Sequence, residues 1–409
     1  MARKAKRDLT IEEQLARGPM DLPFLALVFL LTGIGLIMLL SASYASAYYD
    51  IEHVTGGNPY YYALRQAEFA AMGFVVLYLV SKLNYQHLRW ISVLALIGSI
   101  LLLILVITPV GVKVNGSQRW LKLLLFAGPT YQPSEVAKLA IILFFSARLS
   151  KRESQLKAPR KYSRRTRWGR TLNFLQRIGF LELAYYGAIL LAVALLMMLQ
   201  PHMSGTILIL VGAAAVLFAS GIHMAWFAGA GATVVGALLF IMTQTDYMNA
   251  RLEALKDPWS VYYNGGYQLI HSQIAIGSGG LLGLGLGNSK QKFLYLPEEH
   301  NDFIFAIVCE ELGLVGACII LLLFALLILR AYWIALHARD RFGTLVVVGI
   351  TTLFAVQVFL NIGVVSGLLP TTGISLPFFS YGGTALLIQL AEMGIILSVS
   401  RQIPAKKEG

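Results

Sequence analysis

Long apolar runs without a single charge are the feature that most constrains the fold of this chain. Leu22 to Leu40 contains no charged side chain, and neither does Ile91 to Val112. Each run has the length of about 20 apolar residues that a membrane-spanning helix needs. Only 13% of all residues are charged, whereas a soluble domain carries about a quarter. The sequence therefore predicts an all-α polytopic membrane protein.

The apolar runs predict about ten transmembrane helices. Their expected ranges are 22–44, 66–83, 90–110, 134–149, 180–199, 204–220, 223–243, 303–329, 342–365 and 383–400. Together they form one membrane domain over residues 22–400, between a tail at 1–21 and a tail at 401–409.

Lysine and arginine concentrate in alternate connections. The N-terminal tail, the loop 151–177, the segment after 329 and the C-terminal tail are basic, whereas 45–60 and 366–382 contain no lysine or arginine. The positive-inside rule places the basic segments and both termini in the cytoplasm, and the long loop 244–302 outside. The net charge of +12 is thereby explained by topology, so no nucleic-acid partner is expected. The basic loop is interpreted as a topology anchor rather than a specific lipid site.

Two further features exclude common alternatives. The only cysteines, Cys309 and Cys318, share one apolar run, so neither a disulfide framework nor a cysteine-based metal site is predicted. The glycine-rich run 277–287 has no preceding strand, so it is not a dinucleotide-binding motif. Flexible or re-entrant backbone near the outer membrane surface is the expectation for it.

Polar residues in or beside the predicted spans gather in the outer half of the membrane. Such residues are costly in lipid and usually face a cavity or a partner. The uncharged connection 367–383, rich in proline and glycine, is expected to fold into the same outer cavity. The clustered residues are Arg65, Glu68, Arg119, Trp120, Glu135, Lys138, His202, Glu298, His300, Asp302, Glu310, Glu311, Gln357, Asn361 and Glu392.

Several of these residues also have purely structural interpretations. Glu135 and Lys138 share one helical face and can form an ion pair that makes insertion cheaper. Asp302 stands where an N-cap of the helix after 303 would stand. Trp120 suits an interfacial aromatic belt. The side chains of Glu310 and Glu311 point about 100° apart on a helix, so at most one of them enters a given site.

Six segments together resemble the SEDS family (shape, elongation, division and sporulation), in family order and over essentially the whole membrane domain. The form of the last one resembles the division member more than the elongation member. They are Asn115-Gly-Ser-Gln-Arg-Trp120, Gln132-Pro-Ser-Glu-Val-Ala-Lys138, Gln200-Pro-His-Met-Ser-Gly205, Ala275-Ile-Gly-Ser-Gly-Gly280, Leu296-Pro-Glu-Glu-His-Asn-Asp-Phe303 and the stretch 361–383.

The resemblance implies a peptidoglycan glycosyltransferase that polymerises lipid II outside the bacterial cytoplasmic membrane, at the division septum. It implies a class B penicillin-binding protein and other divisome membrane proteins as partners. It makes Asp302 the essential carboxylate, with the remaining site residues in the cavity: Arg65, Arg119, Trp120, Glu135, Lys138, Glu298 and His300.

Transfer of a sugar to a hydroxyl needs a general base, and the leaving pyrophosphate needs positive charge. A divalent cation, Mg²⁺ or Mn²⁺, is compatible with this chemistry, with Asp302 as its candidate ligand; no organic cofactor is expected. Position 202 is His where many members have Asp, which puts a charge role for that turn in doubt. The alternatives are a flippase for the same lipid, the elongation or sporulation paralogue, and a non-catalytic scaffold.

Overall fold

The computed structural model describes residues 18–52, 54–114, 117–122, 130–151, 180–200, 202–222 and 253–403, with a few single positions between them. The span predicted at 223–243, most of the basic loop 151–177 and both outermost tails lie outside these residues. The described helices are α2 (Leu22–Tyr49), α3 (Tyr61–Lys82), α4 (Leu88–Ile107), α5 (Pro133–Leu149), α8 (Phe180–Leu199), α9 (Met203–Ala219), α12 (Tyr267–Ser278), α13 (Ile304–Leu336), α14 (Arg341–Val365) and α15 (Gly383–Ser400).

The chain is a multi-pass membrane protein. Within the described residues, six helices are long and apolar enough to span a bilayer: α2, α3, α4 with the short turn before it, α13, α14 and α15. The apolar parts of α8 and α9 are shorter, and α5 has 17 residues. The predicted ranges 180–199 and 383–400 coincide with α8 and α15. The full count of ten remains a prediction.

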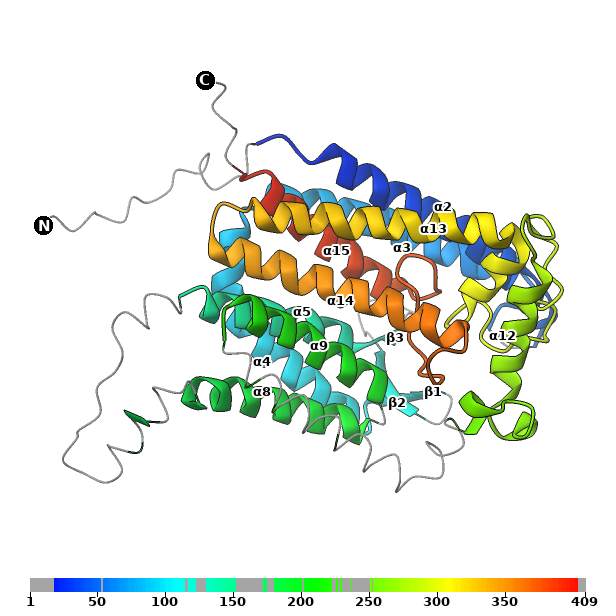
Figure 1. Ribbon diagram of the computed structural model, residues 1–409, viewed down its shortest axis with the longest axis horizontal. Coiled ribbons are helices and arrows are strands. Elements are labelled where there is room, and N and C mark those ends of the chain that lie inside the picture. Colours follow the sequence, from blue (N-terminus) through cyan, green and yellow to red (C-terminus); the bar gives the residue numbers. More distant parts are fainter. Residues whose placement is uncertain are drawn as a thin grey trace, which may run out of the picture.

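The long helices run side by side along the long axis of the molecule, and α12 lies at one end of them (Figure 1). Helix α15 packs on α3, α5 on α4 and α9, and α14 on α9 and α13, which also contacts α2. Fully buried phenylalanines fill the spaces between these helices, among them Phe24, Phe145 and Phe324.

Charged groups join the helices at the end of the bundle where both ends of the described chain meet. Asp21 accepts the Phe24 amide as the N-cap of α2 and pairs with Arg330 at 2.9 Å. Arg89 pairs with Asp340, and Arg401 Nε donates to the Gly18 carbonyl at 3.1 Å. The concentration of arginine at this end is what the positive-inside rule expects of a cytoplasmic face.

The all-α expectation is wrong in the connection between α4 and α5. A three-stranded antiparallel sheet forms there, in the order β1-β2-β3. Its strands are β1 (Gly111–Val114), β2 (Ser117–Lys122) and β3 (Thr130–Tyr131). Trp120 on β2 stands opposite Val112 on β1. Backbone pairing with neighbouring strands satisfies the polar groups of a segment that is too short and too polar to span.

Helix α13 is broken at Gly313, whose φ of 66° and ψ of −171° are not helical. The glycine-rich segment pairs with the backbone on both sides of this break. Leu284 N donates to the Glu310 carbonyl at 3.0 Å, and Leu314 N donates to the Gly280 carbonyl at 2.9 Å. A Cβ on Gly313 would lie 2.3 Å from Gly283 N. The segment 279–285 is therefore a fixed partner of α13 rather than a free loop.

The buried carboxylates of Glu310 and Glu311 interact with the residues that follow this segment, 289–292. Glu310 accepts from the Lys290 amide at 3.0 Å and from the Ser289 hydroxyl. Glu311 pairs with the buried Lys292 at 2.9 Å and accepts from Ser41 of α2. Each carboxylate thus has a separate structural role, consistent with their different directions on the helix.

Candidate active site

Asp302 lies immediately before the broken helix α13, where its main chain is fixed by α14. Its carbonyl oxygen accepts from Asn361 Nδ2 at 2.7 Å. The helix begins after Phe303, and no side chain caps it. The Asp302 carboxylate therefore does not have the N-cap role that its sequence position also allowed.

The connection 367–383 closes over Asp302. Tyr381 N donates to the His300 carbonyl at 2.9 Å, and Ser380 Oγ donates to the Asn301 carbonyl at 2.7 Å. A Cβ on Gly373, which has a φ of +70°, would lie 3.2 Å from Asp302 Oδ2. The segment packs against the carboxylate itself, as its composition predicted.

Polar side chains from α3, α9, α14 and the loop 244–302 form hydrogen bonds with the backbone of this connection. Gln66 of α3 donates to the Ser380 carbonyl at 3.0 Å and accepts from Gly382 N at 3.1 Å. Ser204 of α9 donates to the Thr372 carbonyl at 2.6 Å, and Asn361 donates also to the Ile374 carbonyl at 2.7 Å. Arg251 donates to the Thr371 carbonyl. The position of the connection is thus determined by the whole bundle.

Charges of both signs surround the Asp302 carboxyl group. Burial and, after it, the Glu298 carboxylate raise its pKa, whereas Arg119, His300 and Arg251 lower it, and the net result is a pKa of about 6. At neutral pH Asp302 is therefore mostly ionised. Neutral pH also lies close enough to this pKa for the carboxylate to accept a proton efficiently.

His300 stands in an aromatic group beside this carboxylate. Its ring stacks on Tyr62 with centroids 4.5 Å apart and lies 6.2 Å from the ring of Tyr381. Arg65 lies on the outer side of the same group, half exposed, 3.8 Å from Glu68 and 5.8 Å from the Tyr61 ring centroid. The structure thus connects Arg65 to the rim of the site through aromatic residues, not to Asp302 directly.

Glu135 and Lys138 form the expected ion pair in the first turns of α5. Lys138 Nζ lies 2.8 Å from Glu135 Oε2, and the two side chains are only 4% and 12% exposed. Glu392 of α15, also buried, is an electrostatic neighbour of both. The pair is therefore part of a charged group of three that joins α5 to α15.

Arg119 interacts with Asp302 and with the turn that contains Gln200 and His202. It acts electrostatically on Asp302 and on His202, and its Nε donates to the Gln200 carbonyl at 3.4 Å. Burial, together with Arg119 and Lys138, lowers the pKa of His202 to about 3. His202 is therefore neutral, which agrees with the doubt about a charge role for this turn. Trp120, next to Arg119 on β2, is half-buried.

The described residues do not build a dedicated metal site. Nowhere among them do three histidine, cysteine, aspartate or glutamate side chains meet as a donor set. Glu298, the carboxylate that acts electrostatically on Asp302, accepts from Asn301 Nδ2 at 2.6 Å. A divalent cation with Asp302 as a ligand remains a prediction.

Arg251 is the site residue that the sequence reasoning missed. It lies in the predicted outer loop 244–302, which also contains Lys256, Lys290 and Lys292. No sequence signal therefore distinguished Arg251 from the other cations of this loop. The contribution of Gln66 could not be recognised, because a single glutamine in an apolar helix gives no indication of its partner.

The comparisons with known proteins cover nearly the whole chain. The family model described as "Cell cycle protein", for FtsW, RodA and SpoVE, matches residues 22–404. A "Probable peptidoglycan glycosyltransferase FtsW" of Geobacter metallireducens is 37% identical, covering 94% of this chain and 95% of that protein. "Stage V sporulation protein E" of Bacillus subtilis is 38% identical, covering 93% of this chain and 97% of that protein.

Two solved structures share the fold. One, described as "Structural coordination of polymerization and crosslinking by a peptidoglycan synthase complex", matches with a TM-score of 0.69 and 26% identity, over 93% of this chain and 98% of that one. The rod shape determining protein RodA of Thermus thermophilus matches with a TM-score of 0.61 and 26% identity, over 95% and 98%.

Proposed function

Since the chain belongs to the FtsW/RodA/SpoVE family of cell cycle proteins, we propose that it is a peptidoglycan glycosyltransferase. Its reaction polymerises lipid II into glycan strands on the outer face of the bacterial cytoplasmic membrane. The observation that carries this proposal is the Asp302 carboxylate, held at the outer end of a broken helix with Arg119, His300 and Arg251 acting on it.

In the proposed reaction, a sugar hydroxyl of one lipid-linked disaccharide attacks the anomeric carbon of another. Asp302 takes the hydroxyl proton as the new carbon–oxygen bond forms. The bond from the anomeric carbon to the lipid pyrophosphate breaks, and its electron pair leaves with the pyrophosphate. Arg119 and Arg251 are the cations best placed to stabilise that charge, because both act on Asp302.

Lys138 and Arg65 have less direct roles in this scheme. Lys138 is committed to Glu135 at 2.8 Å, so its part is to hold α5 and to contribute positive potential behind Arg119. Arg65, on the exposed rim, is assigned to the approach of the phosphate groups. His300 and Trp120 are assigned to contacts with the sugars.

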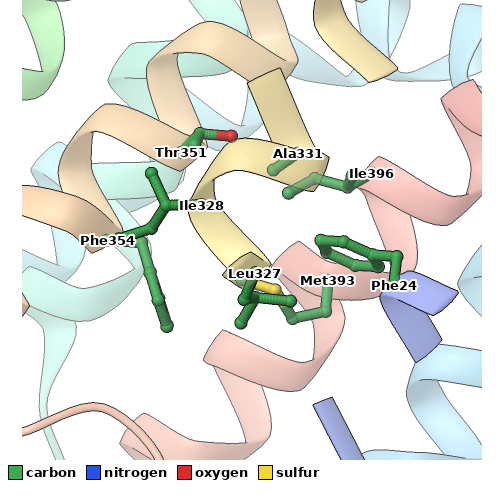
Figure 2. A pocket seen from close by; sticks show the side chains of 8 residues that line it. All are labelled: Phe24, Leu327, Ile328, Ala331, Thr351, Phe354, Met393 and Ile396. Carbon is green, nitrogen blue, oxygen red and sulfur yellow. The ribbon is translucent and has the colours of Figure 1, made fainter. Parts of the chain in front are cut away.

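A flippase needs a polar path through the membrane, and one pocket between the membrane-spanning helices can be compared with that requirement. Figure 2 shows a pocket between α2, α13, α14 and α15 in which Thr351 is the single polar side chain. Its other lining residues are Phe24, Leu327, Ile328, Ala331, Phe354, Met393 and Ile396. This pocket does not provide a polar path between these four helices, which supports the polymerase over the flippase.

The test uses the purified full chain with lipid II, with and without a class B penicillin-binding protein, and scores glycan polymer on a gel. Asp302→Asn should fold and make no polymer, whereas Asp257→Asn, a change of an exposed carboxylate in the same outer loop, should polymerise normally. Polymerisation at wild-type rate by folded Asp302→Asn protein would falsify the catalytic assignment. Transport of labelled lipid II across vesicles without any polymer would instead identify a flippase.

We propose further that the protein acts at the division septum with a class B penicillin-binding protein and other divisome membrane proteins. The division and sporulation relatives are similarly close, at 37% and 38% identity, so the composition of the 367–383 segment is the support for the division role. A fluorescent fusion should gather at mid-cell in dividing cells. An even distribution along the lateral wall would point to elongation.

A further inference from the structure

Exposed apolar side chains lie on the segment that pairs with the break in α13. They are large hydrophobic side chains with unusually high exposure: Leu282 is 80% exposed and Leu281 is 68% exposed. Clusters of exposed large apolar side chains mark contact with a membrane or another protein. We call this group of side chains the outer apron and define it by Leu281, Leu282, Leu284, Leu286, Phe293, Leu294 and Tyr295.

The depth of the outer apron follows from its backbone pairing with α13. Val315 N donates to the Leu281 carbonyl at 3.1 Å, and Gly285 N donates to the Glu311 carbonyl at 3.0 Å. The part of α13 from the break to its inner end, residues 314–336, rises about 34 Å. Since the hydrocarbon core is about 30 Å thick, the break and the outer apron lie at its outer boundary.

The outer apron also continues a stripe of α13 that faces lipid. Leu314 and Val315, next to the break, are exposed, and so are Ile319 and Leu322 further along the helix. The hydrogen bond from Val315 to Leu281 joins this stripe to the outer apron without an intervening polar residue. The outer apron and the stripe of α13 therefore face the same environment.

Irregular backbone can enter a membrane boundary only when its polar groups have protein partners. This segment meets that condition. Gly283 N donates to the Gly279 carbonyl at 2.8 Å, and Asn288 Nδ2 donates to the Leu284 carbonyl at 3.1 Å. The Glu310 carboxylate accepts the amides of Lys290 and Gln291. The leucines point away from this polar network, so the segment is amphipathic.

We infer that the outer apron is inserted into the outer leaflet, with its leucine and phenylalanine side chains among the first carbons of the acyl chains. The inserted side chains fix the position of the membrane surface relative to α13. Asp302 lies directly before the first turn of this helix. The inference is independent of the reaction assigned above, because it depends only on burial, depth and hydrogen bonding.

The experiment places an environment-sensitive fluorophore on Leu282→Cys in the full chain, with Cys309→Ala and Cys318→Ala removing the native thiols. The protein is reconstituted alone in phosphatidylcholine and phosphatidylglycerol vesicles that contain nitroxide lipids. Lys256→Cys, exposed in the same outer loop, is the matched control. We expect shallow nitroxides to quench the Leu282 label at least threefold more than the Lys256 label, and aqueous iodide to show the opposite preference.

A second variant pair makes the result independent of the label. Leu281→Ser with Leu282→Ser should reduce lipid quenching of a label at Leu286→Cys, whereas Ile51→Ser with Val54→Ser, exposed apolar residues of another outer connection, should not. Equal access of iodide to the Leu282 and Lys256 labels in folded protein would overturn the inference. Because the vesicles contain no partner, that result would assign the outer apron to a protein contact.

Discussion

At the scale of single residues, the protonation of Asp302 determines when the site can act. Because a base must be ionised to accept a proton, polymerisation should fall as the pH drops through about 6, the pKa to which burial raises this carboxyl group. Glu298→Gln removes a negative neighbour that raises this pKa, so the acidic limb of the profile should move to lower pH. Initial rates of polymer formation between pH 5 and pH 8 measure this, and an unmoved limb in the variant would argue against Asp302 as the titrating base.

The Glu135–Lys138 pair gives a second prediction at this scale. Removal of one partner of a buried ion pair costs about 3–5 kcal/mol. Lys138→Ala should be the worse single change, because it leaves Glu135 and the neighbouring Glu392 without their shared cation. The double change should cost less than the sum of the single changes. Thermal unfolding in detergent gives these values, and strictly additive losses would contradict the pairing.

At the scale of elements, the break in α13 depends on glycine at two contacting positions. Gly313→Ala combines an unfavourable positive φ with a Cβ only 2.3 Å from Gly283 N. Gly287→Ala, with a φ of +84° and nothing within 4 Å of the added Cβ, costs only the backbone strain of about 1–2 kcal/mol. We therefore expect Gly313→Ala to lose activity and thermal stability, and Gly287→Ala to keep most of both. Equal effects of the two changes on activity and melting temperature would show that the close contact is unimportant.

At the scale of the whole molecule, the end of the bundle with the arginine pairs should face the cytoplasm. In a background without Cys309 and Cys318, Lys256→Cys should react with an impermeant thiol reagent in intact cells. His337→Cys, exposed between α13 and α14, should react only after permeabilisation, because the positive-inside rule places this connection inside. Labelling of His337→Cys in intact cells would reverse the topology.

The sequence was sufficient for what depends on local composition. Apolar length located α8 and α15 to the residue, and the charged and polar pattern placed Asp302, Arg119 and the 367–383 connection at one outer site. Long-range backbone pairing could not be predicted. Residues 303–329 contain no proline that would mark a break at Gly313, so the break depends on backbone partners at 280–285. The sheet between α4 and α5 likewise depends on pairing between separate strands.

The two hydrogen bonds that Gln66 forms with the backbone of Ser380 and Gly382 have a consequence for biosynthesis. Helix α3 leaves the ribosome early. The connection that closes over Asp302 emerges near the end of translation, followed by α15, which packs on α3. A nascent chain that already carries Arg119, Arg251, His300 and Asp302 still lacks Glu392 and the connection that closes over Asp302. We therefore expect the site to act only after the final helix has been made, so that an unfinished copy in the membrane does not begin a strand.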